Sequence, residues 1–170
     1  VRPVVWEGEA ARLSPIPIGT LSSGYRANIS GPLNQLTSRG TAGGDISVAA
    51  LQILQVGGNA QGLHLLIGAD RGDDAALGGD GANADSYKAG TLSRIRISGD
   101  LTDSSILIGI DPTDSRYYDG NDRQLGGSNQ RIQELLIGGR LQPGSQIIAP
   151  AYPLTLSHNP SADGSAMVCS

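Results

Sequence analysis

The sequence predicts an all-β fold, a parallel β-solenoid (right-handed β-helix) of about four repeats of about 40 residues with long side loops rich in Gly and Asp. The first observation behind this is a repeated Leu/Ile-x-x-Leu/Ile-x-Ile/Val pattern followed by Gly or Ser-Gly, whose last apolar residue is Ile18, Val56, Ile97 and Ile137 in turn. These anchors are 38, 41 and 40 residues apart, and such self-similarity indicates a repeat architecture. We expect the four anchors to stack as one inward-facing ladder at the roughly 4.8 Å spacing of neighbouring strands.

The second observation is the spacing inside each pattern. In Ile95-Arg96-Ile97 a polar residue separates two β-branched residues, and a period of two indicates a half-buried strand rather than a helix. Glycines after each run permit a sharp turn. Each repeat is therefore expected to hold two short strands around a glycine corner, with second strands centred on 65–67, 106–108 and 147–148.

The expected organisation along the chain follows from these strands. Val4-Val5-Trp6 is a plausible first strand, and Pro15 and Pro17 predict that the strand around Ile16 lies at an edge, because proline cannot donate to a ladder. Residues 33–50 are expected to be a short connection. One solenoid domain should then span residues 1–150, with an irregular cap or tail at 151–170. Its repeats are predicted near 13–50, 51–91, 92–131 and 132–150.

Three other repeat architectures fit less well. Propellers of the WD type have blades of similar length but need four strands per blade, and the long connections here are too rich in Gly and Asp to supply two more. Leucine-rich and HEAT-type repeats need helical stripes, which the sequence lacks.

Composition limits the classes of protein that remain. The chain has 170 residues, 25 of them Gly, with no Phe and one Trp, so the core must be aliphatic and thin. Its net charge is −4 and its Arg residues are scattered, so no nucleic-acid-binding stripe is expected. The sequence contains no stretch of 18 apolar residues and therefore predicts no membrane-spanning segment. Because the chain begins Val1-Arg2-Pro3, we expect a processed chain or an excised fragment. The absence of a signal peptide from this sequence therefore does not exclude secretion.

Acidic residues concentrate in two long connections. Eleven of the 13 Asp lie between Asp70 and Asp122, and Ca²⁺ prefers six to eight oxygens from carboxylates, carbonyls and Asn side chains. Tentative Ca²⁺ binding is therefore one hypothesis; the other is that these Asp side chains form surface turns and caps. The candidate metal ligands are Asp70, Asp73, Asp74, Asp80, Asn83, Asp85, Asp111, Asp114, Asp119, Asn121 and Asp122.

Two short strings within these connections have a family likeness. Residues 78–83, GGDGAN, resemble the calcium-binding nonapeptide G-G-x-G-x-D of RTX proteins, with Asn in place of Asp. Residues 119–125, DGNDRQL, resemble the G-N-D-x-L stretch of the same family. The likeness covers under a tenth of the chain, and the tandem nonapeptides that let neighbouring RTX turns share each ion are missing.

A broader likeness covers about residues 45–150. The runs ISGDLTDSSILIGIDPTD and LLIGADRGDD resemble repeats of large secreted or surface-attached bacterial β-helix proteins of the filamentous-haemagglutinin and autotransporter-passenger type. This resemblance implies an extracellular structural or adhesive role, on the cell surface or secreted. Because the chain has far fewer coils than those proteins, we expect a non-enzymatic module that docks on further copies of itself or on other subunits.

The alternative function is a carbohydrate-binding or polysaccharide-degrading β-helix, with glycans as partners. Arg94 and Arg96, beside Asp100 or Asp103, could hold an acidic sugar, although a solvated strand face is the favoured explanation. The sequence contains no G-x-S-x-G, H-E-x-x-H or P-loop motif. Three other features are expected to be incidental: the glycosylation pattern at 28–30, the Arg-Gly-Asp tripeptide at 71–73, and the lone His64 in a strand.

Overall fold

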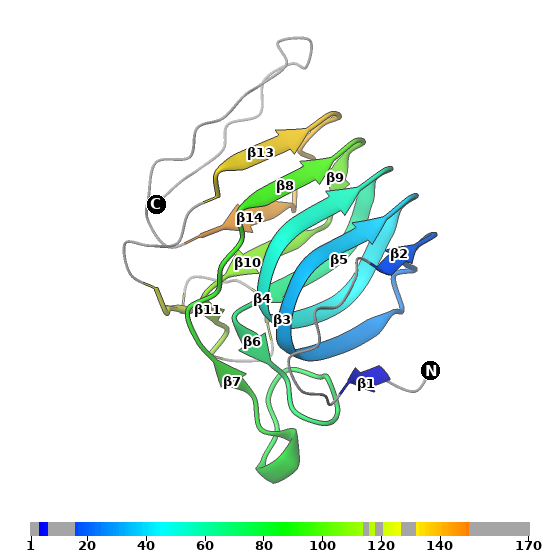
Figure 1. The fold of residues 1–170 in the computed structure, drawn as a ribbon. Helices are drawn as coiled ribbons and strands as arrows, with labels where there is room; N and C mark the ends of the chain where they lie inside the picture. Colours follow the sequence, from blue (N-terminus) through cyan, green and yellow to red (C-terminus); the bar gives the residue numbers. More distant parts are fainter. Residues whose placement is uncertain (1–3, 7–15, 114–115, 118–120, 127–131, 150–170) are drawn as a thin grey trace.

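The computed structural model describes residues 4–6, 16–113, 116–117, 121–126 and 132–149. These residues form one ten-stranded sheet, parallel throughout and curled into a half-barrel, together with two small antiparallel sheets (Figure 1). The only helix among them is the 3₁₀ turn η1 (Gly81–Asn83). The prediction of an all-β chain is therefore confirmed at the level of class.

The large sheet contains two long strands and eight short ones. Its members are β1 (Val4–Trp6), β2 (Ile16–Ile18), β3 (Arg26–Ser38), β4 (Ala42–Val56), β5 (Ala60–Ile67), β8 (Arg94–Ile97), β9 (Leu101–Thr102), β10 (Ser105–Ile108), β13 (Glu134–Ile137) and β14 (Gln146–Ile148). The small sheets pair β6 (Ala69–Asp70) with β7 (Ser86–Tyr87), and β11 (Ile110–Asp111) with β12 (Arg123–Gln124).

The long strands β3 and β4 bend and thereby run through both arms of the curled sheet (Figure 1). The first arm consists of β1, the N-terminal halves of β3 and β4, and the strands β5, β10 and β14. The second arm consists of β2, the C-terminal halves of β3 and β4, and the strands β8 and β13. The register of β3 against β4 shifts between Ile29 and Pro32, where β3 passes from one arm to the other.

Aliphatic side chains fill the space inside the curl. In β8 the exposed Arg94 and Arg96 alternate with Ile95 and Ile97, which are almost completely buried. In β10 the inward Ile106 and its neighbours on other strands join the same core cluster, which contains no buried aromatic side chain among the described residues. Burying one such aliphatic side chain contributes about 1.5–3 kcal/mol.

The predicted right-handed β-solenoid of four 40-residue repeats is wrong, because the parallel sheet is a curled half-barrel. Val56 pairs with Ile97, and Ile97 with Ile137, so the spacing of about 40 residues does correspond to neighbouring strands there. At the N-terminal side, however, Ser38 lies in register between Ile18 and Val56. The spacing of neighbouring strands there is about half of a predicted repeat.

The reason for this error is the polar sequence of the second half of β3. Residues 33–38 follow the repeated pattern, with Leu33 beside Leu51 and Leu36 beside Leu54, but Ser38 takes the position of the apolar anchor. The sequence analysis therefore treated this segment as a connection. The Ser38 hydroxyl compensates for its burial by donating to backbone carbonyls, among them that of Thr41 at 3.1 Å.

A column of stacked glycines forms the corner that follows the second arm. The amide of Gly58 donates to the carbonyl of Gly40 (3.1 Å), Gly99 donates to Gly58 (2.9 Å), and Gly139 donates to Gly99 (3.0 Å). A Cβ on Gly58 would lie 3.0 Å from the Gly40 carbonyl carbon. Glycine thus lets successive corners approach closely enough for backbone hydrogen bonding, and we call these four residues the glycine column.

Replacing Gly57, beside this column, with Ala should destabilise the fold by about 1–3 kcal/mol, because the new Cβ would overlap the backbone carbonyl of Arg39. Urea unfolding monitored by circular dichroism measures this loss. The matched control is Gly24→Ala, where a Cβ meets no atom within 4 Å. Equal midpoints for the two variants would contradict the packing described for this corner.

Candidate functional site

Two loops leave the first arm at equivalent places and return to cover its outer face. The first loop (residues 69–90) begins after Gly68 and the second loop (residues 110–126) after Gly109, and both glycines have positive φ, 91° and 61°. The amide of Lys88 donates to the Gly68 carbonyl and that of Leu125 to the Gly109 carbonyl, both at 2.7 Å. Each loop is therefore closed at its base by a short antiparallel ribbon, β6–β7 or β11–β12.

A small second core lies between these loops and the sheet. Leu66 of β5 and Leu107 of β10 point away from the main core and are buried. They pack with Ala69 and Ile110 at the loop bases, and with the half-buried Leu77, Tyr87, Tyr117 and Ile148. The loops are thus held on the sheet by apolar contacts as well as by their ribbons.

Arg71 of the first loop lies under this cover with only 1% of its surface exposed. Its guanidinium donates from Nε to the Ser47 hydroxyl (3.1 Å), from Nη2 to the Ala27 carbonyl (3.3 Å) and from Nη1 to the Tyr117 hydroxyl (3.4 Å). These three bonds tie the first loop to β3, to β4 and to the second loop. Because Arg71 is buried, the Arg-Gly-Asp tripeptide is not displayed as an exposed recognition sequence.

Asn28 of β3 connects Arg71 to the acidic end of β6. Its Oδ1 accepts from the Ser47 hydroxyl (2.6 Å) and from the Arg71 amide (3.1 Å). Its Nδ2 donates to Asp70 Oδ1 (2.6 Å) and to the Gly72 carbonyl (2.9 Å). Asn28 is 3% exposed, so its amide is engaged inside the fold and is not presented as a glycosylation acceptor.

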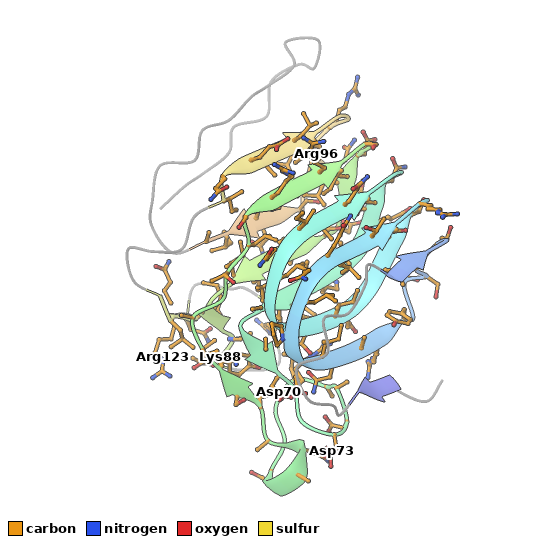
Figure 2. The ribbon with its side chains drawn as sticks, in the orientation of Figure 1. Asp70, Asp73, Lys88, Arg96 and Arg123 are labelled. Atoms are coloured by element: carbon orange, nitrogen blue, oxygen red, sulfur yellow. The ribbon has the colours of Figure 1, made fainter. Side chains whose placement is uncertain are left out.

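A polar pocket of about 350 Å³ opens beside this network. Asp70 and Asp73, which line the pocket, lie in the first loop near the base of the view in Figure 2. Arg96 lies on the second arm, away from this pocket. The pocket brings together carboxylates, hydroxyls and backbone groups, and oxygens of these kinds are the ligands that a hard cation prefers. Its lining consists of Asn28, Ser30, Asp70, Gly72, Asp73, Ala82, Ala84 and Ser86.

The remaining first-loop candidates lie elsewhere, within the local structure of the loop. Asp74 accepts from the amide of Ala76 (3.0 Å), two residues on, as in an Asx-turn. Asp85 accepts from the Gly78 amide (2.7 Å) and from the Tyr87 hydroxyl (2.6 Å). Burial is the main reason that the pKa of Tyr87 is raised, and the hydrogen bond to Asp85 raises it further.

Asp80 directly precedes η1 and Asn83 is its last residue, and both side chains are exposed. The amide of Asn83 donates to the Asp80 carbonyl (3.2 Å) and no side-chain cap bond is made by Asp80. The RTX-like string at 78–83 therefore forms a 3₁₀ turn with exposed side chains.

The described candidates of the second loop, Asp111, Asn121 and Asp122, do not line the pocket. Asp111 pairs with Arg123 across the ribbon at 3.1 Å. The backbone carbonyl of Asn121 accepts from the Thr113 hydroxyl (3.3 Å), and Asp122 is half-buried. Asp114 and Asp119 lie outside the described residues. Within the described part of the chain, no three Asp, Glu, His or Cys side chains gather as a metal-ligand group.

The outer face of the second arm carries the two arginines considered for sugar binding. Arg94 Nε lies 2.7 Å from Glu134 Oε2, and Arg96 Nη2 lies 2.6 Å from Glu134 Oε1. The hydrogen bond from Arg96 chiefly holds the pKa of Glu134 below its ordinary value. Both arginines are therefore paired with one carboxylate on the neighbouring strand.

Comparison with protein-family models, with curated proteins and with solved structures found no match to this chain. Across the residues that the structure describes, no helix has the length and apolar character needed to cross a bilayer.

Three residues that line the pocket are not predicted from the sequence: Asn28, Ser30 and Ser86. Asn28 and Ser30 lie far from the acidic loop in sequence, and only the pairing of β3 with β4 brings them near it. One signal was present: Asn28 and Ser47 alternate with apolar residues in their strands, so they mark a polar row on the outer face.

Replacing Arg71 with Ala should lower the free energy of unfolding by about 2–4 kcal/mol, because it leaves a cavity and removes bonds to three buried groups. Chemical denaturation provides the measurement. Arg39→Ala, which truncates an exposed side chain, is the control and should change stability by less than about 0.5 kcal/mol. A loss in Arg71→Ala no larger than in the control would show that the buried arginine does not anchor the loop.

Proposed function

We propose that this protein is a non-enzymatic structural module that assembles head to tail with further copies of itself. The observation that carries the proposal is that, among the described residues, no further strand follows β13 and β14 at this end of the core. Three inward residues at this end are half-buried, whereas their neighbours one strand earlier are buried; the inward Leu135 of β13 is itself buried. The buried and half-buried partners are Ile97 and Ile137, Leu101 and Leu141, and Ile106 and Ile147.

The opposite end of the sheet offers a complementary surface. In the described residues, β1 and β2 each pair on one side only, with β3. They lie on the same two arms as β14 and β13, respectively, and all these strands are parallel. By continuation of the register, Ile18 of a second copy would follow Ile137, and Val4 would follow Ile147. Such an addition would cover half-buried apolar groups and unpaired edge amides together.

The proposed contact joins two different surfaces, so it is heterologous and leads to rings or open chains rather than closed dimers. Addition of parallel strands in one direction favours an open chain. A secreted or cell-surface location, which the sequence likeness to surface proteins implies, belongs to the same proposal because a repeating structural module suits that setting.

Replacing Ile137 with Asp should abolish this association, because it places a charge on the open end of the core. The matched control is Leu136→Asp on the same strand, whose side chain is 40% exposed and whose register partner is Arg96 on the outer face. Light scattering coupled to size exclusion over a range of protein concentrations should show oligomers for the wild type and for the control only.

Circular dichroism of both variants checks that each remains folded. A wild type that stays monomeric at the highest concentration, or equal association of the two folded variants, would contradict assembly through this end.

A second candidate property is Ca²⁺ binding at the pocket beside β6. Its support is that Asp70 and Asp73, both predicted as ligands, line one pocket with the Gly72 backbone and the serine residues Ser30 and Ser86. Two carboxylates and several neutral oxygens match the ligand preference of this ion but supply little charge, so weak binding is expected.

If the pocket binds Ca²⁺, millimolar Ca²⁺ should raise the melting temperature and a chelator should reverse the change. The double substitution Asp70→Asn with Asp73→Asn should remove the response. Asp100→Asn, a carboxylate at the glycine corner, serves as the control and should retain it. An unchanged wild-type melting temperature would reject the ion and favour the turn-forming role of these residues.

A further inference from the structure

The outer face of the first arm holds a stacked pair of aromatic rings that joins the second loop to the sheet. His64 projects outward from β5, between Asp45 of β4 and Ser105 of β10. The ring of Tyr117 lies parallel to the His64 imidazole, with 4.3 Å between centroids and 9° between planes. The second loop thus covers this strand position with one flat aromatic contact.

Tyr117 is held at its hydroxyl as well as at its ring. The hydroxyl accepts from Arg71 Nη1 at 3.4 Å and makes a side-chain hydrogen bond with Asp45. Burial is the main reason that the pKa of Tyr117 is raised, with Asp45 adding to it. The tyrosine therefore stays neutral at physiological pH and connects the sheet, the first loop and the second loop.

The environment of His64 disfavours its protonated form. Its Nδ1 is buried and has no hydrogen-bond partner among the described residues. An imidazolium must donate from both nitrogens, so protonation would leave a buried N–H donor unsatisfied. Burial lowers the pKa of His64 most, Asp45 opposes this, and Arg71 lowers it further.

The charged groups around the imidazole come from each element packed against it. Asp45 is the nearest carboxylate, but it already lies 3.5 Å from Arg26 Nε of β3. The first loop contributes buried Arg71, and the second loop contributes Tyr117, with exposed Arg116 beside it in sequence. On β10 the neighbouring Ser105 is uncharged. A protonated His64 would therefore add a third positive charge, after Arg26 and Arg71, beside the single carboxylate of Asp45.

We propose that His64 is a pH-sensitive latch, whose protonation under mildly acidic conditions releases the second loop and exposes the apolar strip beneath it. The strip consists of Leu66, Leu107 and half-buried Ile148, which are adjacent in register on the outer face. Uncovered, these residues form an apolar surface on the outer face of the first arm. This inference is independent of the end-to-end assembly proposed above.

The direction of the pH effect follows from linkage. Because the pKa of His64 is lower in the folded protein than its ordinary value of 6.5, the unfolded or opened state binds the proton more readily. The stabilising contribution of neutral His64 is complete above pH 6.5. It is lost progressively as the pH falls from there through the lowered pKa of the closed state.

Hydrogen–deuterium exchange of the full chain at pH 7.5 and pH 5.0, corrected for the intrinsic pH dependence, tests the latch. In the wild type, protection of peptides from the second loop should fall at least about tenfold at pH 5.0, because the opened state binds the proton more readily than the closed state. Peptides from β4 and β8 should remain protected. In His64→Gln, which cannot be protonated, the second loop should show the same protection at both pH values.

Two further measurements keep the test decisive if His64→Gln does not fold. An NMR titration of wild-type imidazole signals, with His158→Gln to assign them, should give His64 a pKa below the ordinary value of 6.5. Tyr117→Ala should expose the second loop at both pH values and bind a hydrophobic dye at pH 7.5. An ordinary His64 titration, or a loop opening that persists unchanged in folded His64→Gln, would overturn the proposal.

Discussion

Backbone hydrogen bonding at the glycine column is the constraint on which the curled sheet depends. Gly40, Gly58, Gly99 and Gly139 connect through their main chains at one corner, and the strands on either side inherit their spacing from these contacts. A side chain at this point would separate successive corners by more than a hydrogen bond can span. The two arms can therefore face each other across a core whose buried side chains, among the described residues, are aliphatic.

With the corner fixed, the two faces of the first arm take different roles. Inward residues such as Leu65 and Ile106 complete the main core, and the outward Leu66 and Leu107 support a second core under the loops. Polar residues on the same outer face, above all Asn28 and Ser47, bind the buried Arg71. One strand pattern thus specifies both the interior of the sheet and the attachment of its loops.

Much of the local structure could be predicted from the sequence. The alternation at 94–97 and the register of Val56, Ile97 and Ile137 follow from apolar periodicity, and the glycines after these anchors do lie at a corner. The predicted architecture was wrong because Ser38 occupies the position of an apolar anchor. The second half of β3 was therefore not recognised as a strand, and the repeat length predicted at the N-terminal side was about twice the actual strand-to-strand spacing. The pocket could be predicted only in part, because Asp70 and Asp73 were identifiable as oxygen donors while Asn28 depends on a strand pairing that the pattern did not reveal.

The uninterrupted course of β3 and β4 through both arms has a consequence for the order in which the sheet comes apart. These two strands pair with each other over nearly their full length, and opening that pair requires both arms to separate at once. Beyond β4, each arm continues through separate strands of two to eight residues. Thermal fraying can therefore proceed one short strand at a time from the β13–β14 side, and it halts at β4, where the remaining ladder can be lost only cooperatively.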